Sequence, residues 1–211
     1  MFRWKMASLL ALGVVLLNGC GKDEDPVKAA DQTLDEPKLM ATWEGPCKLK
    51  MFDISARQVV QFSGASFQEA LVGYEDDKCQ KPSIQLRYQG ALTLKDEPKE
   101  GIRHIDLQYK QASLKPLSDA GKKLLEGVKA CGIEAWEVGK RVDVTGAERG
   151  AVCKFRSIPS EDFNAVLLEG DKMYLGKAGL IDIVAAADDA SRPKNVDKKQ
   201  QFQHSKMDLG D

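Results

Sequence analysis

The stretch SIQLRYQGALTL, at residues 83–94, decides the fold of this chain. Large apolar side chains occupy every second position of the stretch, and mostly polar side chains stand between them. This period of two is typical of a half-buried β-strand. Gly90 interrupts the apolar positions, and a glycine there indicates a bulge or a sharp bend, as at the corner of a barrel. The stretch therefore predicts one long strand that bends at Gly90.

Two segments before this strand, residues 57–62 and 67–74, alternate in the same way around the loop Ser63-Gly64-Ala65-Ser66. They predict a β-hairpin with a four-residue loop. After the strand, the alternation resumes at residues 105–109 and places His104 on the polar face. Further short strand candidates lie at residues 136–138, 142–144, 152–155, 163–168, 173–175 and 181–184.

One helix is predicted, over residues 118–131. Pro116 ends the preceding strand, and Ser118 can cap the start of the helix. Gly132 follows the helix directly, where a left-handed C-terminal cap favours glycine. The side chains expected on the buried face of the helix are Ala120, Leu124, Leu125 and Val128.

About eight short antiparallel strands, with one helix before the last of them, predict a mainly β domain. An up-and-down barrel is the expected architecture, and a β-sandwich is the alternative. The pair Thr42-Trp43 resembles the G-x-W first strand of the lipocalin and calycin barrels, although Ala41 stands where that motif has glycine. Trp43, Tyr88 and Tyr109 are candidates for lining a ligand cavity, or simply for filling the core.

The first residues have the pattern of a secretory signal. Arg3 and Lys5 form a basic start, and residues 6–17 form an uncharged, mostly apolar run. A helix made of this run would be about 18 Å long, which is short for a hydrocarbon core of about 30 Å. Residues 1–19 are therefore expected to be a signal peptide.

The sequence Leu17-Asn18-Gly19-Cys20 resembles the lipobox of bacterial lipoproteins. The resemblance implies cleavage before Cys20 and attachment of fatty acyl chains, such as palmitate, to that residue. Two or more acyl chains anchor a protein stably to a membrane. By the same resemblance, Gly21 in place of the aspartate that favours inner-membrane retention implies the outer membrane, if the host is Gram-negative. The alternative is a plain secretory signal with an incidental cysteine. Residues 20–38 are expected to form a flexible tether.

Four cysteines remain beyond Cys20, and an even number in an exported protein predicts disulfides. The favoured pairs are Cys47–Cys79 and Cys131–Cys153, since each closes a short segment of predicted hairpins, and two other connectivities remain open. The cysteines are widely spaced with no C-x-x-C pair, so no metal site is predicted.

The chain also resembles a group of little-characterised bacterial lipoproteins over about residues 40–195. The resemblance implies a compact, β-rich envelope domain and no particular activity. We expect this domain at residues 39–190, followed by a polar, disordered tail at 191–211. The matching features are Trp43 with Cys47, the loop Tyr74 to Cys79, the helix start Pro116 to Gly121, and Cys131-Gly132.

The composition and motifs argue against several classes of function. The chain has 31 Lys and Arg against 32 Asp and Glu, with no basic stripe, so a nucleic-acid partner is not expected. No G-x-S-x-G, H-E-x-x-H or phosphate-binding glycine loop occurs, so neither catalytic residues nor a cofactor are predicted. His104 and Asp106 share an outer face and are expected to be a solvated pair. The acidic loop at residues 75–77 lacks the regular ligand spacing of a calcium site.

The sequence therefore predicts a lipid-anchored lipoprotein of the bacterial cell envelope that is not an enzyme. It would bind a small apolar molecule or another envelope protein. The alternative is an inhibitor of a periplasmic or foreign hydrolase such as lysozyme, acting through a loop at residues 75–78 or 146–150. An enzyme that uses His104 is a third hypothesis.

Overall fold

The computed structural model describes residues 38–95, 101–147, 158–176 and 188–210. The chain divides into two units, Met1–Gln32 and Thr33–Asp211, and every described residue belongs to the second. The predicted signal peptide, the lipidated Cys20 and the tether up to residue 37 lie outside the described residues. Within the described ranges, no helix has the length and apolar character needed to cross a membrane.

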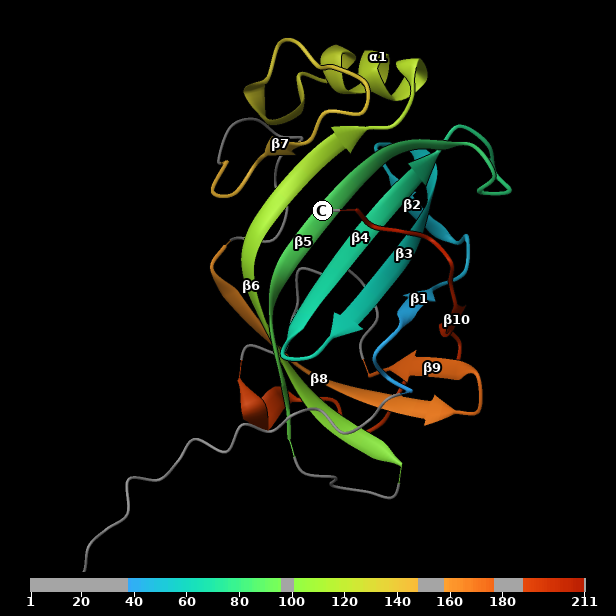
Figure 1. The fold of residues 1–211 in the computed structure, drawn as a ribbon, viewed down its shortest axis with the longest axis vertical. Helices are drawn as coiled ribbons and strands as arrows, with labels where there is room; N and C mark the ends of the chain where they lie inside the picture. Colours follow the sequence, from blue (N-terminus) through green and yellow to red (C-terminus); the bar gives the residue numbers. More distant parts are fainter. Residues whose placement is uncertain (1–37, 96–100, 148–157, 177–187, 211) are drawn as a thin grey trace, which may run out of the picture. The chain divides into compact units, whose positions relative to one another are not determined.

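Eight antiparallel strands close into a barrel (Figure 1). Each strand is hydrogen-bonded to the next, and the short first strand bonds to both the second and the last strand of the ring. The up-and-down barrel is therefore confirmed, and the sandwich alternative is wrong. In order around the ring, the strands are β1 (Thr42–Glu44), β3 (Ile54–Ser63), β4 (Ser66–Tyr74), β5 (Pro82–Leu94), β6 (Ile102–Pro116), β8 (Ser160–Glu169), β9 (Lys172–Leu175) and β10 (Gln201–His204).

Two short strands extend this sheet outside the ring. β2 (Leu49–Met51) pairs with β3, and β7 (Val142–Asp143) pairs with β6. The strand predicted at residues 136–138 is wrong, because this segment is irregular although Trp136 is buried. The candidates at 152–155 and 181–184 lie outside the described residues.

The long strand β5 bends where the sequence predicts it. The register with β6 shifts between Gln89 and Gly90, so that Gln89 faces Gln111 while Gly90 faces Tyr109. The backbone of β6 approaches so closely that a Cβ atom on Gly90 would lie 1.8 Å from the carbonyl oxygen of Gln108. Only glycine fits this approach, and the predicted bulge is confirmed.

The hairpin of β3 and β4 is tighter than predicted. Ser63 and Ser66 still pair across the strands, so the loop consists of Gly64 and Ala65 alone, and the predicted four-residue loop is wrong. Gly64 has a φ of +56°, which a two-residue hairpin turn requires and glycine adopts at little cost.

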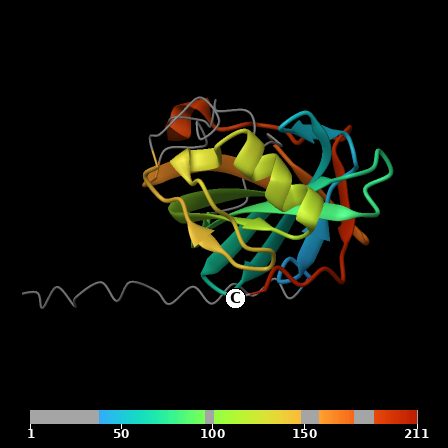
Figure 2. The same ribbon diagram turned by 90° about the horizontal axis from the view of Figure 1, so that it is seen from above.

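The helix α1 (Asp119–Gly127) lies across one end of the barrel (Figure 2) and contacts β5 and β6. Its predicted cap is confirmed, since the Ser118 hydroxyl accepts a hydrogen bond from the Gly121 amide at 3.1 Å. The predicted end at residue 131 is wrong. Lys129 adopts a left-handed conformation that stops the helix, and a 3₁₀ turn, η1 (Ala130–Gly132), follows.

The predicted buried face of α1 is only partly right. Leu125 is fully buried and Leu124 and Val128 are half-buried, but Ala120 is exposed. Gly121 occupies the closest approach instead, since a Cβ atom there would lie 1.9 Å from the carbonyl oxygen of Ser83. The closest contact of the helix with the barrel is therefore made at a glycine rather than at an alanine.

The prediction of a disordered tail after residue 190 is wrong for the residues up to 210. The 3₁₀ helix η3 (Asp189–Ser191) and β10 are ordered elements, and Phe202 packs into the core. The segment after β10 crosses the outside of β3 and β4 toward β5 (Figure 1), where Leu209 covers Val59, Ala70 and Val72. The barrel domain thus extends past 190 because β10 supplies the last wall strand.

Two arginines hold the end of this segment. Arg87 donates to the carbonyl oxygens of Leu209, at 3.3 Å, and of Gly210, and Arg141 donates to the Leu209 oxygen at 3.2 Å. Partial burial and the neighbouring Arg87 guanidinium lower the pKa of Arg141 to about 10. The guanidinium groups therefore satisfy carbonyl groups that no sheet partner reaches.

The predicted Cys47–Cys79 disulfide is confirmed, with 5.9 Å between the two Cα atoms. It joins the loop after β1 to the loop after β4, which are 32 residues apart in sequence. Cys131 is also part of a disulfide. Its predicted partner, Cys153, lies outside the described residues, so this second pairing stays a prediction.

Candidate functional site

The barrel interior contains polar groups at positions where the strand alternation puts apolar side chains. Glu69 lies on β4 between Phe67 and Leu71, which both point into the core. Gln58 lies on β3 between the inward-facing Ala56 and Val60. Glu69 is only 5% exposed and Gln58 only 2%. Such groups destabilise a core unless hydrogen bonds satisfy them.

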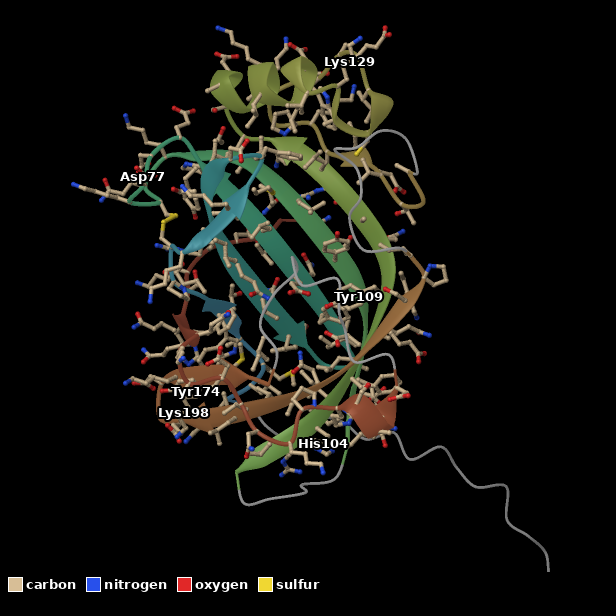
Figure 3. The ribbon with its side chains drawn as sticks, turned by 180° about the vertical axis from the view of Figure 1, so that it is seen from behind. Asp77, His104, Tyr109, Lys129, Tyr174 and Lys198 are labelled. Carbon is tan, nitrogen blue, oxygen red and sulfur yellow. A yellow bond between two sulfur atoms is a disulfide. The ribbon has the colours of Figure 1, made fainter. Side chains whose placement is uncertain are left out.

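Hydrogen bonds connect these two residues to Tyr109 of β6. The Tyr109 hydroxyl donates to one carboxylate oxygen of Glu69 at 2.6 Å, and the Gln58 side-chain amide donates to the other at 2.5 Å. Tyr109 is labelled in Figure 3, among the side chains of the barrel. The three side chains, called here the interior triad, run across β3, β4 and β6.

The aromatic residues predicted to line a cavity separate into two places. Tyr88 and Tyr109 lie together, with their rings edge to face and 5.7 Å between centroids. Trp43 instead stacks on His204 at 4.1 Å and donates its ring N–H to the Leu39 carbonyl oxygen. All three are at most 1% exposed, and they line neither of the two pockets described below. That they line a cavity stays a prediction.

The barrel wall has an opening where β1 ends at Glu44. The Gly45 amide still donates to the Gln58 carbonyl oxygen at 2.8 Å, but Pro46 has no N–H to continue the ladder. A pocket of about 280 Å³, called here the notch, lies at this break. Its lining residues are Gly45, Pro46, Lys48, Leu49, Gln58, Asp197, Lys199, Gln200 and Phe202.

The notch reaches the interior triad through Gln58. The amide nitrogen of Gln58 is engaged by Glu69, whereas its buried side-chain oxygen accepts no hydrogen bond from any described residue. Leu49 and Phe202 supply apolar surface beside it. The notch is therefore a mainly apolar recess, and Gln58 connects its lining to the interior triad.

A second recess of about 400 Å³, called here the outer pocket, adjoins the notch. The two share four lining residues, Gly45, Pro46, Lys48 and Lys199. The outer pocket is lined mainly by cationic and amide side chains, and its one acidic residue is Glu44, which pairs with Arg57 at 3.0 Å. The remaining lining residues are Lys198, Gln201 and Gln203.

His104 lies on β6, lines neither described pocket and is not arranged as a catalytic pair with Asp106. The carboxylate of Asp106 is bound by Arg192 at 2.5 Å and by Lys95 at 3.2 Å. Partial burial, together with the Arg192 guanidinium, lowers the pKa of His104 below its usual value. Asp106 therefore orders Arg192 rather than orienting the imidazole.

The acidic loop after β4 uses its carboxylates internally. Asp76 accepts hydrogen bonds from the backbone amides of Lys78, Gln80 and Lys81, and these outweigh the opposing effect of desolvation and lower its pKa. Asp77 accepts from the Ser55 hydroxyl at 2.7 Å. Across the described ranges, no three His, Cys, Asp or Glu side chains gather in a way that could hold a metal ion.

Comparison with models of known protein families and with curated protein sequences gives no match. Neither the notch nor the interior triad was expected from the sequence, apart from Tyr109. One signal was present, because Glu69 occupies an apolar phase between Phe67 and Leu71. A second signal was Pro46, which cannot continue the ladder after Gly45, although the pocket at this break also depends on the residues before and within β10 that line it.

Proposed function

We propose that this protein is a non-enzymatic binding module whose barrel takes a small, mainly apolar molecule in the notch. The observation that carries the proposal is Gln58, a residue of the notch lining that is 2% exposed and whose buried side-chain oxygen has no hydrogen-bond partner among the described residues. A buried acceptor without a donor is unfavourable. A ligand with a hydroxyl or N–H group on an apolar body would satisfy it.

The size and lining of the notch support a ligand of modest size. Ligand pockets commonly have volumes of about 300–1,000 Å³, with mostly apolar walls and a few placed polar groups. The notch, at about 280 Å³, lies near the lower end of that range. Phe202 and Leu49 form the apolar walls, and the interior triad fixes the orientation of Gln58 through Glu69.

Filling the notch should abolish binding without unfolding the protein. Leu49 is half-buried and lines the notch. We expect Leu49→Trp to weaken binding of the neutral fluorescent probe N-phenylnaphthylamine by at least about tenfold, because the indole would occupy the volume of the ligand. A fluorescence titration measures the affinity, and thermal unfolding checks that the fold is kept.

The neighbouring Lys50→Trp variant is the matched control. It adds the same indole to β2, but the Lys50 side chain is 63% exposed and lines neither described pocket. Binding in this variant should equal that of the wild type. Equal affinity in Leu49→Trp and in the wild type would contradict the proposal. Native mass spectrometry of protein from its own host should then identify the bound mass.

We place this module in the bacterial cell envelope, most specifically the outer membrane, with Cys20 as its lipid anchor. The support is the signal-like residues 1–19 and the lipobox-like sequence that ends at Cys20. Radiolabelled palmitate should enter the wild-type protein and not the Cys20→Ser variant. If the wild-type protein were exported without incorporating palmitate, residues 1–19 would be a plain secretory signal instead.

A further inference from the structure

The outer pocket suggests which class of ligand the notch takes. Four of its lining residues are cationic, Lys48, Arg57, Lys198 and Lys199. Arg57 is paired with Glu44, and Lys198 is paired with Glu169 at 2.5 Å. Lys48 and Lys199 have no ion-pair partner among the described residues, and they line both pockets. Two positive charges without an ion-pair partner in the described part of the chain therefore lie at the border between the apolar recess and the outer pocket.

The one acidic side chain in the notch, Asp197, offsets only one of these two charges. The Asp197 carboxylate accepts a hydrogen bond from the Lys199 backbone amide at 2.9 Å and so is partly engaged in its own turn. The notch is apolar at Phe202 and Leu49, and its lining includes Gln58, whose buried side-chain oxygen has no hydrogen-bond partner among the described residues. The three features together are a mainly apolar recess, a lining residue with a buried acceptor that no described residue satisfies, and cations at the border of the recess.

We infer that the ligand is a small amphipathic anion. Its apolar body would lie in the notch against Phe202 and Leu49, a donor group on that body would reach Gln58, and its acid group would lie between Lys48 and Lys199. This inference rests on the proposed function and adds the requirement for the negative charge. Charges at such an exposed border act through screened electrostatics, so they give a modest preference that falls with salt.

A pair of matched probes distinguishes the proposed function from the added requirement for a negative charge. Anilinonaphthalene sulfonate and N-phenylnaphthylamine share one aromatic skeleton and one N–H donor, and only the first is an anion. We expect the wild type to bind the sulfonate about tenfold more tightly in low salt, and this preference should shrink when the salt rises from about 0.05 M to about 0.5 M. The Lys48→Gln/Lys199→Gln variant should lose the preference and keep its affinity for the neutral probe.

The control is Lys194→Gln/Lys206→Gln, which removes two exposed lysines that line neither described pocket and should keep the preference. The wild type could bind both probes with equal affinity while Leu49→Trp binds neither of them. This result would overturn the anion requirement and leave the proposed function standing. If Leu49→Trp left the affinity for both probes unchanged, the proposed function and the anion requirement would both be overturned.

Discussion

Deleting residues 201–211 is expected to abolish the cooperative unfolding transition of the protein. The deletion removes β10, so the facing edges of β1 and β9 lose their hydrogen-bond partners and the barrel opens. It also removes Phe202 and Leu209, each only 1% exposed. Replacing one such side chain with alanine costs about 2–5 kcal/mol, and the whole stability of a domain is commonly about 5–15 kcal/mol. The combined loss therefore approaches or exceeds the total.

Urea unfolding followed by tryptophan fluorescence measures this effect, because Trp43 is fully buried and its strand pairs with β10. Phe202→Ala should lower the free energy of unfolding by about 3–5 kcal/mol, and Leu209→Ala by about 2–5 kcal/mol. Gln203→Ala, on the same strand but exposed, should change it by less than about 0.5 kcal/mol. A truncated protein with the midpoint of the wild type would show that β10 is not needed to close the wall.

Replacing Gly90 with alanine should destabilise the protein more than any other addition of one methyl group in the barrel. The new Cβ atom would lie 1.8 Å from the Gln108 carbonyl oxygen and 2.9 Å from a ring carbon of Phe67. The carbonyl belongs to the β6 backbone, so the clash is relieved only by separating the two strands at their bulge. We expect a loss of about 3 kcal/mol or more in the free energy of unfolding.

Gly127→Ala provides the contrast. Gly127 is the last residue of α1, and a Cβ atom there would have no heavy atom within 4 Å. Alanine at a helical position should stabilise the protein by about 0.5–1 kcal/mol, since it restricts the unfolded chain. Similar unfolding midpoints for the Gly90 and Gly127 variants would contradict the account of the bulge.

The sequence predicts those parts of the fold that depend on local pattern. Alternating apolar side chains predict β5, and Gly90 predicts its bulge, because only glycine permits the close approach of β6. Ser118 predicts the start of α1 because its hydroxyl satisfies an amide that the helix leaves free. The short segment between Cys47 and Cys79 favours their pairing, which the structure confirms.

The sequence does not predict those parts that depend on contacts made elsewhere. β10 contains one large apolar residue, Phe202, between polar neighbours, so no periodic signal distinguishes it from a disordered tail. Its order comes from hydrogen bonds to β1 and β9 and from the core that Phe202 enters. The early end of α1 likewise depends on the left-handed conformation of Lys129, a residue that seldom adopts it.

The candidate site is harder to predict than the fold for the same reason. Tyr109 is expected inside a barrel because it continues an apolar alternation, but its hydroxyl acquires a role only when Glu69 faces it across the interior. Gln58 lines the notch beside the point where β1 stops at Glu44. Both relations join strands whose pairing the local sequence does not specify.

The central claim is that the notch holds the ligand, and nuclear Overhauser contacts between N-phenylnaphthylamine and the protein test it most directly. The account predicts contacts from the probe protons to the Leu49 methyl groups and to the Phe202 ring, which both line the notch. Contacts confined to surface side chains such as Val138, which is 42% exposed, with none to Leu49 or Phe202, would contradict it.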